Sequence, residues 1–394
     1  MLGMPSAVAA RRGPDYSPAV VRRWPTLVVA VLLLTAASSA AAQAPVPQAE
    51  SYVLVNTRTG AVLAGAKPME RLPMASTTKI MTALIAIEQS DPDDLVTVPP
   101  EAAIGGSTAE LVVGERLRMD DLLTGVLVGS GNDAAITAAH AVAGSEPAFV
   151  DLMNRRAEAL GLRDTRFANS HGLDAPGHYS SVRDLERLGR VAMRQQRFRE
   201  RVGSRRAAIP GPGGVGTRTF ESKNGLLDIF EEADGTKTGQ TADAGYTLVA
   251  RAARPELGVT LGLALIGSPS EAVRAFDAKS LFEWGFRQYA RPELLPDGAV
   301  VGSADIRDRP GVSVDYRVDG AVRMPIRVDG PPIKEVITAP AELQGPVSEG
   351  DVLGEIVVRQ GERELARRDL VAAESATGPG LWDRVRDVLG SLTP

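Results

Sequence analysis

The 394-residue chain contains no cysteine, which excludes disulfide bonds, thiolate nucleophiles and cysteine-ligated metals. Histidine is scarce as well: His140, His171 and His178 are the three, and no His-Glu-x-x-His pattern occurs. The sequence therefore predicts no metal site and no cofactor. A formal net charge of -5 and the lack of a basic cluster argue against a nucleic-acid partner.

Long apolar runs are also missing. The run at 27–34 is too short to span a bilayer comfortably. Four basic residues precede it, and the small residues Ala40-Ala41-Ala42 follow it, which is typical of a secretory signal peptide at 1–42. An uncleaved membrane anchor is the alternative. After cleavage about 350 residues would remain, enough for two domains.

Three short motifs follow one another along the chain. They are Ser76-Thr77-Thr78-Lys79, Ser130-Gly131-Asn132 and Lys237-Thr238-Gly239, separated by about fifty and about a hundred residues. Each alone recurs by chance in a chain of this length. The three in this order resemble the signature of class A β-lactamases and penicillin-binding proteins. The resemblance implies a single reaction centre built around a serine nucleophile.

The first motif supplies a nucleophile and a base. A serine hydroxyl needs an adjacent base at neutral pH, and residues three apart on a helix share one face. The apolar residues at 80–87 predict that a helix from Ser76 enters the core. Burial and a second lysine, Lys237, would lower the pKa of Lys79, so that Lys79 can take the proton of Ser76. The alternative is that Ser76 is a helix N-cap.

These motifs resemble the D-alanyl-D-alanine carboxypeptidases among the low-molecular-mass penicillin-binding proteins. Further similar segments bring the resemblance to most of residues 50–290; they are 73–76, 169–175, 181–184, 234–241 and 244–246. The resemblance implies an acyl-enzyme on Ser76, with Lys79 as general base and Ser130 relaying a proton to the leaving group. Peptidoglycan pentapeptide would be the substrate, losing its terminal D-alanine, and β-lactams would be covalent inhibitors.

The resemblance also implies a substrate-binding set. Asn132 would hold the substrate amide, Lys237 would stabilise developing charge, and Thr238 would bind the terminal carboxylate. Gly239 and Gln240 complete the set, and the backbone N–H groups of Ser76 and Gln240 would form the oxyanion hole. Relatives often carry a histidine after Lys-Thr-Gly, so Gln240 is a departure that leaves the backbone donor in place.

Three other functions fit parts of the same pattern. A D,D-endopeptidase would cut cross-links with the same centre, and a noncatalytic envelope scaffold would bind the wall without reacting. A β-lactamase shares the three motifs, but no clear Glu-x-x-x-Asn occurs between Asn132 and Lys237 to supply a base for fast deacylation. The intact motifs favour an enzyme over a scaffold.

Apolar patterning predicts the fold. We expect an α/β (α+β) transpeptidase domain of the penicillin-binding and β-lactamase type at 48–290, with a hairpin at 50–64 and the Lys-Thr-Gly motif on an edge strand. The glycine-rich stretch 208–217 predicts a loop, and Ser181 with Asp184 predicts a capping box. Alternating Val312, Val314 and Tyr316 predict a small all-β sandwich at 292–374 without catalytic groups.

The last residues predict a short amphipathic helix at 379–394. Its apolar residues lie on one face: Leu381, Trp382, Val385, Val388, Leu389 and Leu392. The helix is too short to span a membrane, and its stripe suits the membrane interface. Docking on the protein itself is the alternative. Together with the leader, this predicts an exported, periplasmic protein attached peripherally to the inner membrane.

Overall fold

The computed structural model describes residues 27–28, 31–34, 43–307 and 309–377. The chain divides into two compact units with the change at Pro292, and the short segment Met324–Asp329 returns to the larger unit. The predicted amphipathic helix and the predicted signal cleavage site lie outside the described residues. Within those residues, no helix is both long and apolar enough to cross a membrane.

A five-stranded antiparallel sheet forms the centre of the larger unit. Its strands, in spatial order, are β4 (Val62–Ala66), β3 (Ser51–Asn56), β11 (Val259–Ser268), β10 (Gly245–Arg254) and β9 (Ala233–Thr241). The hairpin expected at 50–64 is β3 and β4, and the Lys-Thr-Gly motif lies on the edge strand β9. Both predictions are confirmed.

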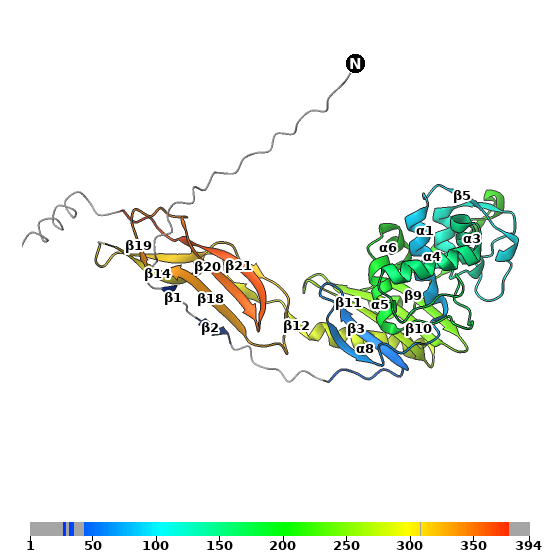
Figure 1. Ribbon diagram of the computed structural model, residues 1–394, viewed down its shortest axis with the longest axis horizontal. Helices are drawn as coiled ribbons and strands as arrows, with labels where there is room; N and C mark the ends of the chain where they lie inside the picture. The colour runs from blue at the N-terminus through cyan, green and yellow to red at the C-terminus, as the bar shows by residue number, and fades with distance from the viewer. Residues whose placement is uncertain (1–26, 29–30, 35–42, 308, 378–394) are drawn as a thin grey trace, which may run out of the picture. The chain divides into compact units, whose positions relative to one another are not determined.

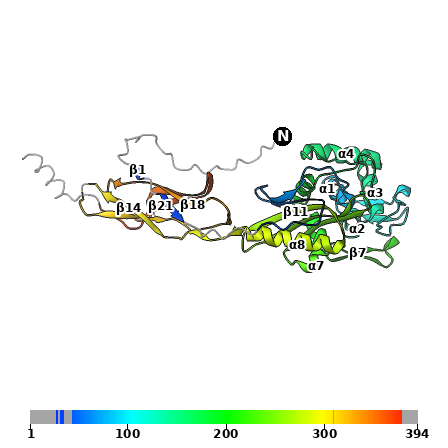
Figure 2. The ribbon, with the colours of Figure 1, turned by 90° about the horizontal axis from the view of Figure 1, so that it is seen from below.

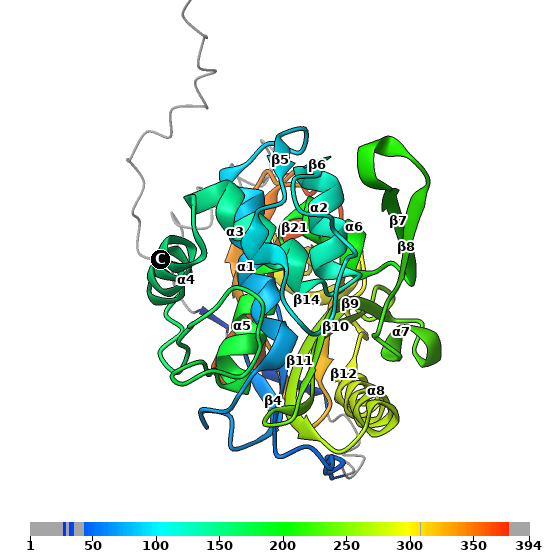
Figure 3. The same cartoon turned by 90° about the vertical axis from the view of Figure 1, so that its right-hand side faces the viewer.

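Helices cover both faces of this sheet (Figure 3). One face carries α8 (Glu271–Arg287), beside which lies the short α7 (Leu226–Ile229), as Figure 2 also shows. The other face carries the helical layer: α1 (Lys79–Gln89), α2 (Met119–Leu127), α3 (Asn132–Ala143), α4 (Glu146–Ala159), α5 (Val182–Ala192) and α6 (Gln196–Val202). The predicted mixed α/β architecture is confirmed.

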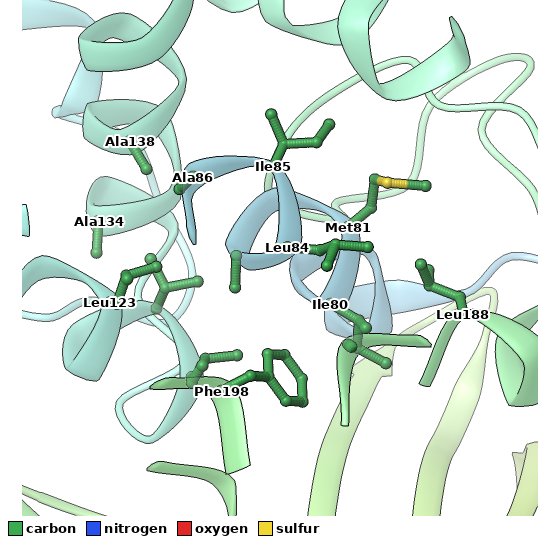
Figure 4. Close-up of a cluster of buried hydrophobic side chains, with 14 of the residues drawn as sticks. Ile80, Met81, Leu84, Ile85, Ala86, Leu123, Ala134, Ala138, Leu188 and Phe198 are labelled. Atoms are coloured by element: carbon green, nitrogen blue, oxygen red, sulfur yellow. The ribbon is translucent and has the colours of Figure 1, made fainter. Parts of the chain in front are cut away.

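Helix α1 is the centre of the helical layer (Figure 4). Its first eight residues are buried all round, because apolar side chains from α2, α3, α5 and α6 surround it. The side chains packed in this cluster include Ile80, Met81, Leu84, Leu123, Ala134, Leu188 and Phe198. Each large apolar side chain contributes about 1.5–3 kcal/mol on burial, so this core holds the start of α1 rigidly.

Three small two-stranded sheets complete the larger unit. They are β5 (Leu95–Thr97) with β6 (Arg116–Arg118), β7 (Arg206–Pro210) with β8 (Thr217–Glu221), and β12 (Tyr289–Ala290) with β17 (Ile326–Arg327). The stretch 208–217, expected to be a loop throughout, is thus partly strand. Glycines confine the irregular part to the hairpin tip at 211–216, where the 3₁₀ turn Pro212–Gly214 lies.

The smaller unit is all β, as predicted. One hydrogen-bonded path runs β1 (Leu27–Val28), β18 (Ile333–Pro340), β20 (Val352–Gln360), β21 (Arg363–Ala372), β15 (Ser313–Val318), β14 (Val300–Ile306) and β19 (Glu342–Leu343). Strand β2 (Val31–Leu34) also pairs with β18, and β13 (Glu293–Leu295) pairs with β16 (Val322–Arg323). Val314, Tyr316 and Val318 are buried in β15 while Ser313 and Asp315 are exposed, which is the predicted alternation.

Candidate active site

Ser76 lies in a 3₁₀ turn, η1 (Ala75–Thr78), that runs directly into α1. No side-chain capping bond is made at the start of η1 or of α1, so Ser76 does not act as a helix N-cap. Lys79 is the first residue of α1, and its Nζ lies 3.0 Å from Ser76 Oγ. The spacing of three residues therefore brings the two reactive groups within hydrogen-bonding distance, as expected.

Lys79 is fully buried and has three oxygen partners. Its Nζ lies 3.0 Å from Ser76 Oγ, 2.7 Å from Asn132 Oδ1 and 2.6 Å from the carbonyl oxygen of His171. A neutral amine has two N–H bonds and one lone pair. The amide and carbonyl oxygens cannot donate, so they take the two N–H bonds, and the lone pair is left facing the hydroxyl of Ser76.

Burial holds the pKa of Lys79 well below its ordinary value of 10.5. The positive charge of Lys237 lowers the pKa further, and the carboxylate of Asp133 opposes these effects. The neutral amine is the form that can accept the proton of Ser76. The structure thus supplies a base for the hydroxyl without a histidine.

The Ser130-Gly131-Asn132 segment forms the break between α2 and α3. The left-handed residue is Ser130, with φ of +58°, whereas Gly131 has φ of −61°. Gly131 is needed for a different reason. A Cβ at this position would lie 2.5 Å from Asp133 Oδ1 and 2.7 Å from the backbone nitrogen of Ala109, so no side chain fits.

Ser130 is paired with the second lysine. Lys237 Nζ donates to Ser130 Oγ at 2.9 Å and to the carbonyl of Thr238 at 3.0 Å. Burial, with added repulsion from Lys223 and Arg274, lowers the pKa of Lys237 to about 7. Ser130 therefore accepts a hydrogen bond from an amine, that of Lys237, which can lose a proton near neutral pH.

Asn132 joins the two halves of the site. Its Oδ1 accepts from Lys79, and its Nδ2 donates to the carbonyl of Gly105 at 2.8 Å. Its backbone N–H donates to the carbonyl of Ser107 at 2.7 Å. The side-chain amide is therefore held in one orientation and leaves one Nδ2 proton for a bound substrate.

Strand β9 lies beside the nucleophile turn. A Cβ at Gly239 would lie 2.8 Å from the backbone nitrogen of Ser76 and 2.9 Å from Ala75 Cβ, so glycine allows the close approach. Thr238 is buried next to it, and Gln240 is exposed at the end of the motif. The eight residues singled out from the sequence are thereby brought together on η1, the first residue of α1, the α2–α3 break and β9.

His171 and Gly172 support the site in a way that sequence patterns did not reveal. The His171 carbonyl accepts from Lys79, and its ring Nδ1 accepts from the N–H of Leu173 at 3.2 Å. Gly172 has φ of +94°, and a Cβ there would lie 2.1 Å from the Ala75 carbonyl oxygen. The only sign of this role in the sequence was a glycine that follows a polar loop residue. The residue that Gly172 approaches, Ala75, lies almost a hundred residues earlier in the chain.

Asp133 anchors the loop that covers Asn132. Its buried carboxylate accepts from the N–H groups of Ala109 and Leu111 and from Thr108 Oγ1. The same carboxylate also accepts from the N–H of Ala134 at the start of α3. This residue follows the Ser-x-Asn motif directly, yet its role depends on a loop more than twenty residues earlier.

Two more cations lie near Lys237. Lys223 Nζ donates to Ser107 Oγ at 3.1 Å, and the buried Arg274 donates to the carbonyl of Lys223 at 2.8 Å. Both lower the pKa of Lys237. The result is a positively charged side of the site, which suits a substrate that ends in a carboxylate.

The capping box at Ser181 is only half formed. Ser181 Oγ accepts from the N–H of Asp184 at 3.2 Å, as predicted. The Asp184 carboxylate instead accepts from the N–H of Asp164 and from Thr165 Oγ1, both at 2.8 Å. It thereby ties a loop to α5.

Comparison with known proteins shows which family the chain resembles over most of its length. Residues 38–266 match the D-alanyl-D-alanine carboxypeptidase family. The chain is 34% identical to the D-alanyl-D-alanine carboxypeptidase DacD of Salmonella typhimurium, over 89% of this chain and 92% of the relative. It is 32% identical to DacC of Escherichia coli, which carries the same enzyme name, over 88% of each chain.

Two solved structures cover different shares of the chain. Penicillin binding protein 5 from Haemophilus influenzae matches with a TM-score of 0.61 and 28% identity, over 86% of this chain and 99% of its own. The DD-transpeptidase of Streptomyces K15 matches with a TM-score of 0.59 and 31% identity, over 62% of this chain and 99% of its own. With the family match spanning more than half of the sequence, this chain belongs to the D-alanyl-D-alanine carboxypeptidase family.

Proposed function

We propose that this protein is a serine-type D-Ala-D-Ala carboxypeptidase that removes the terminal D-alanine from peptidoglycan pentapeptide. The observation that carries the proposal is the contact of 3.0 Å between Ser76 Oγ and Nζ of the fully buried Lys79. A desolvated lysine whose pKa is lowered is a base suited to a serine hydroxyl.

The reaction begins with acylation. Ser76 Oγ attacks the carbonyl carbon of the penultimate D-alanine while its proton passes to Lys79 Nζ. The N–H groups of Ser76 and Gln240 stabilise the oxyanion. The C–N bond then breaks, and the proton held by Lys79 passes through Ser130, which Lys237 holds by hydrogen bonding, to the leaving amine, so that Lys79 is neutral again. Free D-alanine departs and an ester to Ser76 remains.

Water completes the cycle by hydrolysing this ester. Lys79 takes a proton from the attacking water and returns it to Ser76 Oγ, which leaves as the alcohol.

The substrate is held by a separate set of residues. Asn132 binds the peptide amide with its remaining Nδ2 proton. Thr238 and the cations around Lys237 receive the terminal carboxylate of the intact pentapeptide. β-Lactams would follow the same acylation path because their amide takes the place of the D-Ala-D-Ala bond.

Product analysis tests the activity directly. The purified protein is incubated with pentapeptide, and mass spectrometry is expected to detect tetrapeptide and free D-alanine. Cross-linked dimers serve as the comparison substrate, since their preferential cleavage would indicate an endopeptidase. If neither reaction occurs and a fluorescent penicillin does not label the protein, the protein is a noncatalytic scaffold and the proposed activity is wrong.

Gln240 is expected to contribute through its backbone. Gln240→Ala keeps the N–H, so we expect acylation within about threefold of the unchanged protein. Gln240→Pro removes the N–H and should lower the acylation rate by ~10²–10³, as for loss of one oxyanion donor. Rates of fluorescent penicillin binding measure both variants. A fall of the larger size in Gln240→Ala would show that the side chain takes part in the reaction.

The domain roles form a second part of the proposal. Residues 1–42 are a cleaved export signal, so that β1 and β2 leave the sheet of the smaller unit on cleavage. Residues 48–290 are the peptidase domain, 292–374 a noncatalytic β domain, and 379–394 a membrane-associating helix. The protein then acts in the periplasm on the surface of the inner membrane. Support comes from the leader pattern and from the apolar stripe of Leu381, Val385 and Leu389.

Deleting residues 381–394 is expected to move the mature protein from the membrane fraction to the soluble fraction. Turnover of soluble pentapeptide should not change, because the site is built from residues 75–240 of the described chain. Fractionation and immunoblotting of the full-length and shortened proteins measure the effect. If the shortened protein stays with the membrane, or the full-length mature protein is already soluble, the stripe does not anchor it.

A further inference from the structure

The peptide unit between Ala75 and Ser76 follows a residue with a strained backbone. Ala75 has φ of +48°, a region that residues with a Cβ rarely adopt. This unit carries the N–H of Ser76, one of the two donors assigned above to the oxyanion hole. A trans peptide unit is planar, so its C=O and N–H point in opposite directions. Whatever fixes the Ala75 carbonyl therefore also fixes the direction of the Ser76 N–H.

Two buried side chains, Thr78 and His178, form a chain of hydrogen bonds that ends at this carbonyl. Thr78 Oγ1 donates to the Ala75 oxygen at 2.8 Å, and His178 Nε2 lies 2.8 Å from the same Thr78 Oγ1. His178 Nδ1 accepts the N–H of Ala168 at 3.0 Å. Since Nδ1 accepts, the proton of the neutral ring is on Nε2, and His178 donates to Thr78. The hydrogen bonds thus run in one direction, from Ala168 through His178 and Thr78 to Ala75.

The network has one arrangement at neutral pH. His178 is 5% exposed and Thr78 is fully buried, so water does not compete for these bonds. A second ring proton would sit on Nδ1, directly against the N–H of Ala168. Burial, reinforced by the nearby His171, lowers the pKa of His178 to about 4, which keeps the ring neutral.

We propose that Thr78 and His178 are positioning residues that orient the Ser76 N–H toward the oxyanion. The inference rests on the proposed function, since it assigns a task within the same acylation step. It extends the site by a histidine a hundred residues from Thr78, in the loop before α5. Neither side chain contacts Ser76 Oγ or Lys79 Nζ among the hydrogen bonds of the described residues.

Thr78→Val tests the proposal because it replaces the hydroxyl by a methyl group of similar size. The acylation rate with a fluorescent penicillin is expected to fall ~10- to 100-fold, a part of the loss for a missing donor. Affinity for a peptide boronic acid, whose tetrahedral adduct places an oxygen in the hole, should fall by a similar factor. KM for pentapeptide should change less than kcat, and Thr78→Ser should restore the rate.

Three further variants separate positioning from packing. Thr77→Val is the matched control: Thr77 Oγ1 makes the same kind of bond one residue earlier, to the Met74 carbonyl at 2.6 Å. That carbonyl also accepts from Thr247 Oγ1, so we expect a rate close to that of the unchanged protein. His178→Leu should behave like Thr78→Val, and His178→Gln should recover part of the rate by donating to Thr78.

The outcomes are distinguishable. If the unchanged protein is labelled on Ser76 and Thr78→Val acylates at the same rate, the positioning role is overturned. An equal loss in Thr77→Val would overturn it too, because the effect would then be general to the turn. If Thr78→Val does not fold, unchanged acylation in His178→Leu gives the same negative answer. Failure of the unchanged protein to label on Ser76 would instead overturn the proposed function.

Discussion

Ser76→Ala is expected to abolish covalent labelling by a fluorescent penicillin while the protein stays folded. The hydroxyl oxygen is the atom that forms the ester, and alanine has no atom to replace it. The substitution removes one partner of Lys79, but Asn132 Oδ1 and the His171 carbonyl remain. We expect labelling to fall by at least ~10⁴-fold, measured by gel fluorescence and intact mass. Circular dichroism and a thermal midpoint check the fold.

Ser130→Ala is the matched comparison for this experiment. It also removes a serine hydroxyl from the site, but Ser130 is assigned to proton relay and its Oγ contacts Lys237 rather than Lys79. Labelling should become slower and still reach one penicillin per protein. Stoichiometric labelling of Ser76→Ala, mapped to another residue by peptide mass spectrometry, would show that the nucleophile lies elsewhere.

The short-range part of the site was predictable from the sequence. Ser76 and Lys79 are three residues apart, and the apolar residues that follow them indicate a helix with a fixed geometry. Their distance of 3.0 Å follows from this local relation. The strand that carries Lys237 was also predictable, because strand patterning is a local property of the sequence. That this strand meets the other two motifs was expected from the order of the three motifs along the chain.

The long-range part was not predictable from these patterns. The left-handed residue of the second motif is Ser130, and Gly131 is needed for the close contact with Asp133 and Ala109. The Gly172 contact with the Ala75 carbonyl and the His178 bond to Thr78 join segments about a hundred residues apart. Neither contact leaves a periodic or spaced signal, because its geometry depends on the tertiary fold and not on the neighbouring sequence.

Lys79→Met is expected to lower the rate of acylation by ~10²–10⁴, the usual contribution of a general base. Methionine has a similar length and no ionisable group, so it fills much of the fully buried site without supplying a base. Lys79→Ala should show the same loss of rate, with a further loss of stability from the space it leaves. Stopped-flow binding of a fluorescent penicillin measures the rate, and thermal unfolding separates the stability effect.

The pH dependence identifies the base. Burial and Lys237 lower the pKa of Lys79, so the neutral amine forms well below pH 10.5. In the unchanged protein the acylation rate should rise with pH as Lys79 loses its proton, and this rise should vanish in Lys79→Met. Lys237, with a pKa of about 7, is the rival base through its bond to Ser130. If Lys79→Met loses less than about tenfold and keeps the rise, Lys237 acting through Ser130 is the base, and the buried Lys79 only orients Ser76 and Asn132.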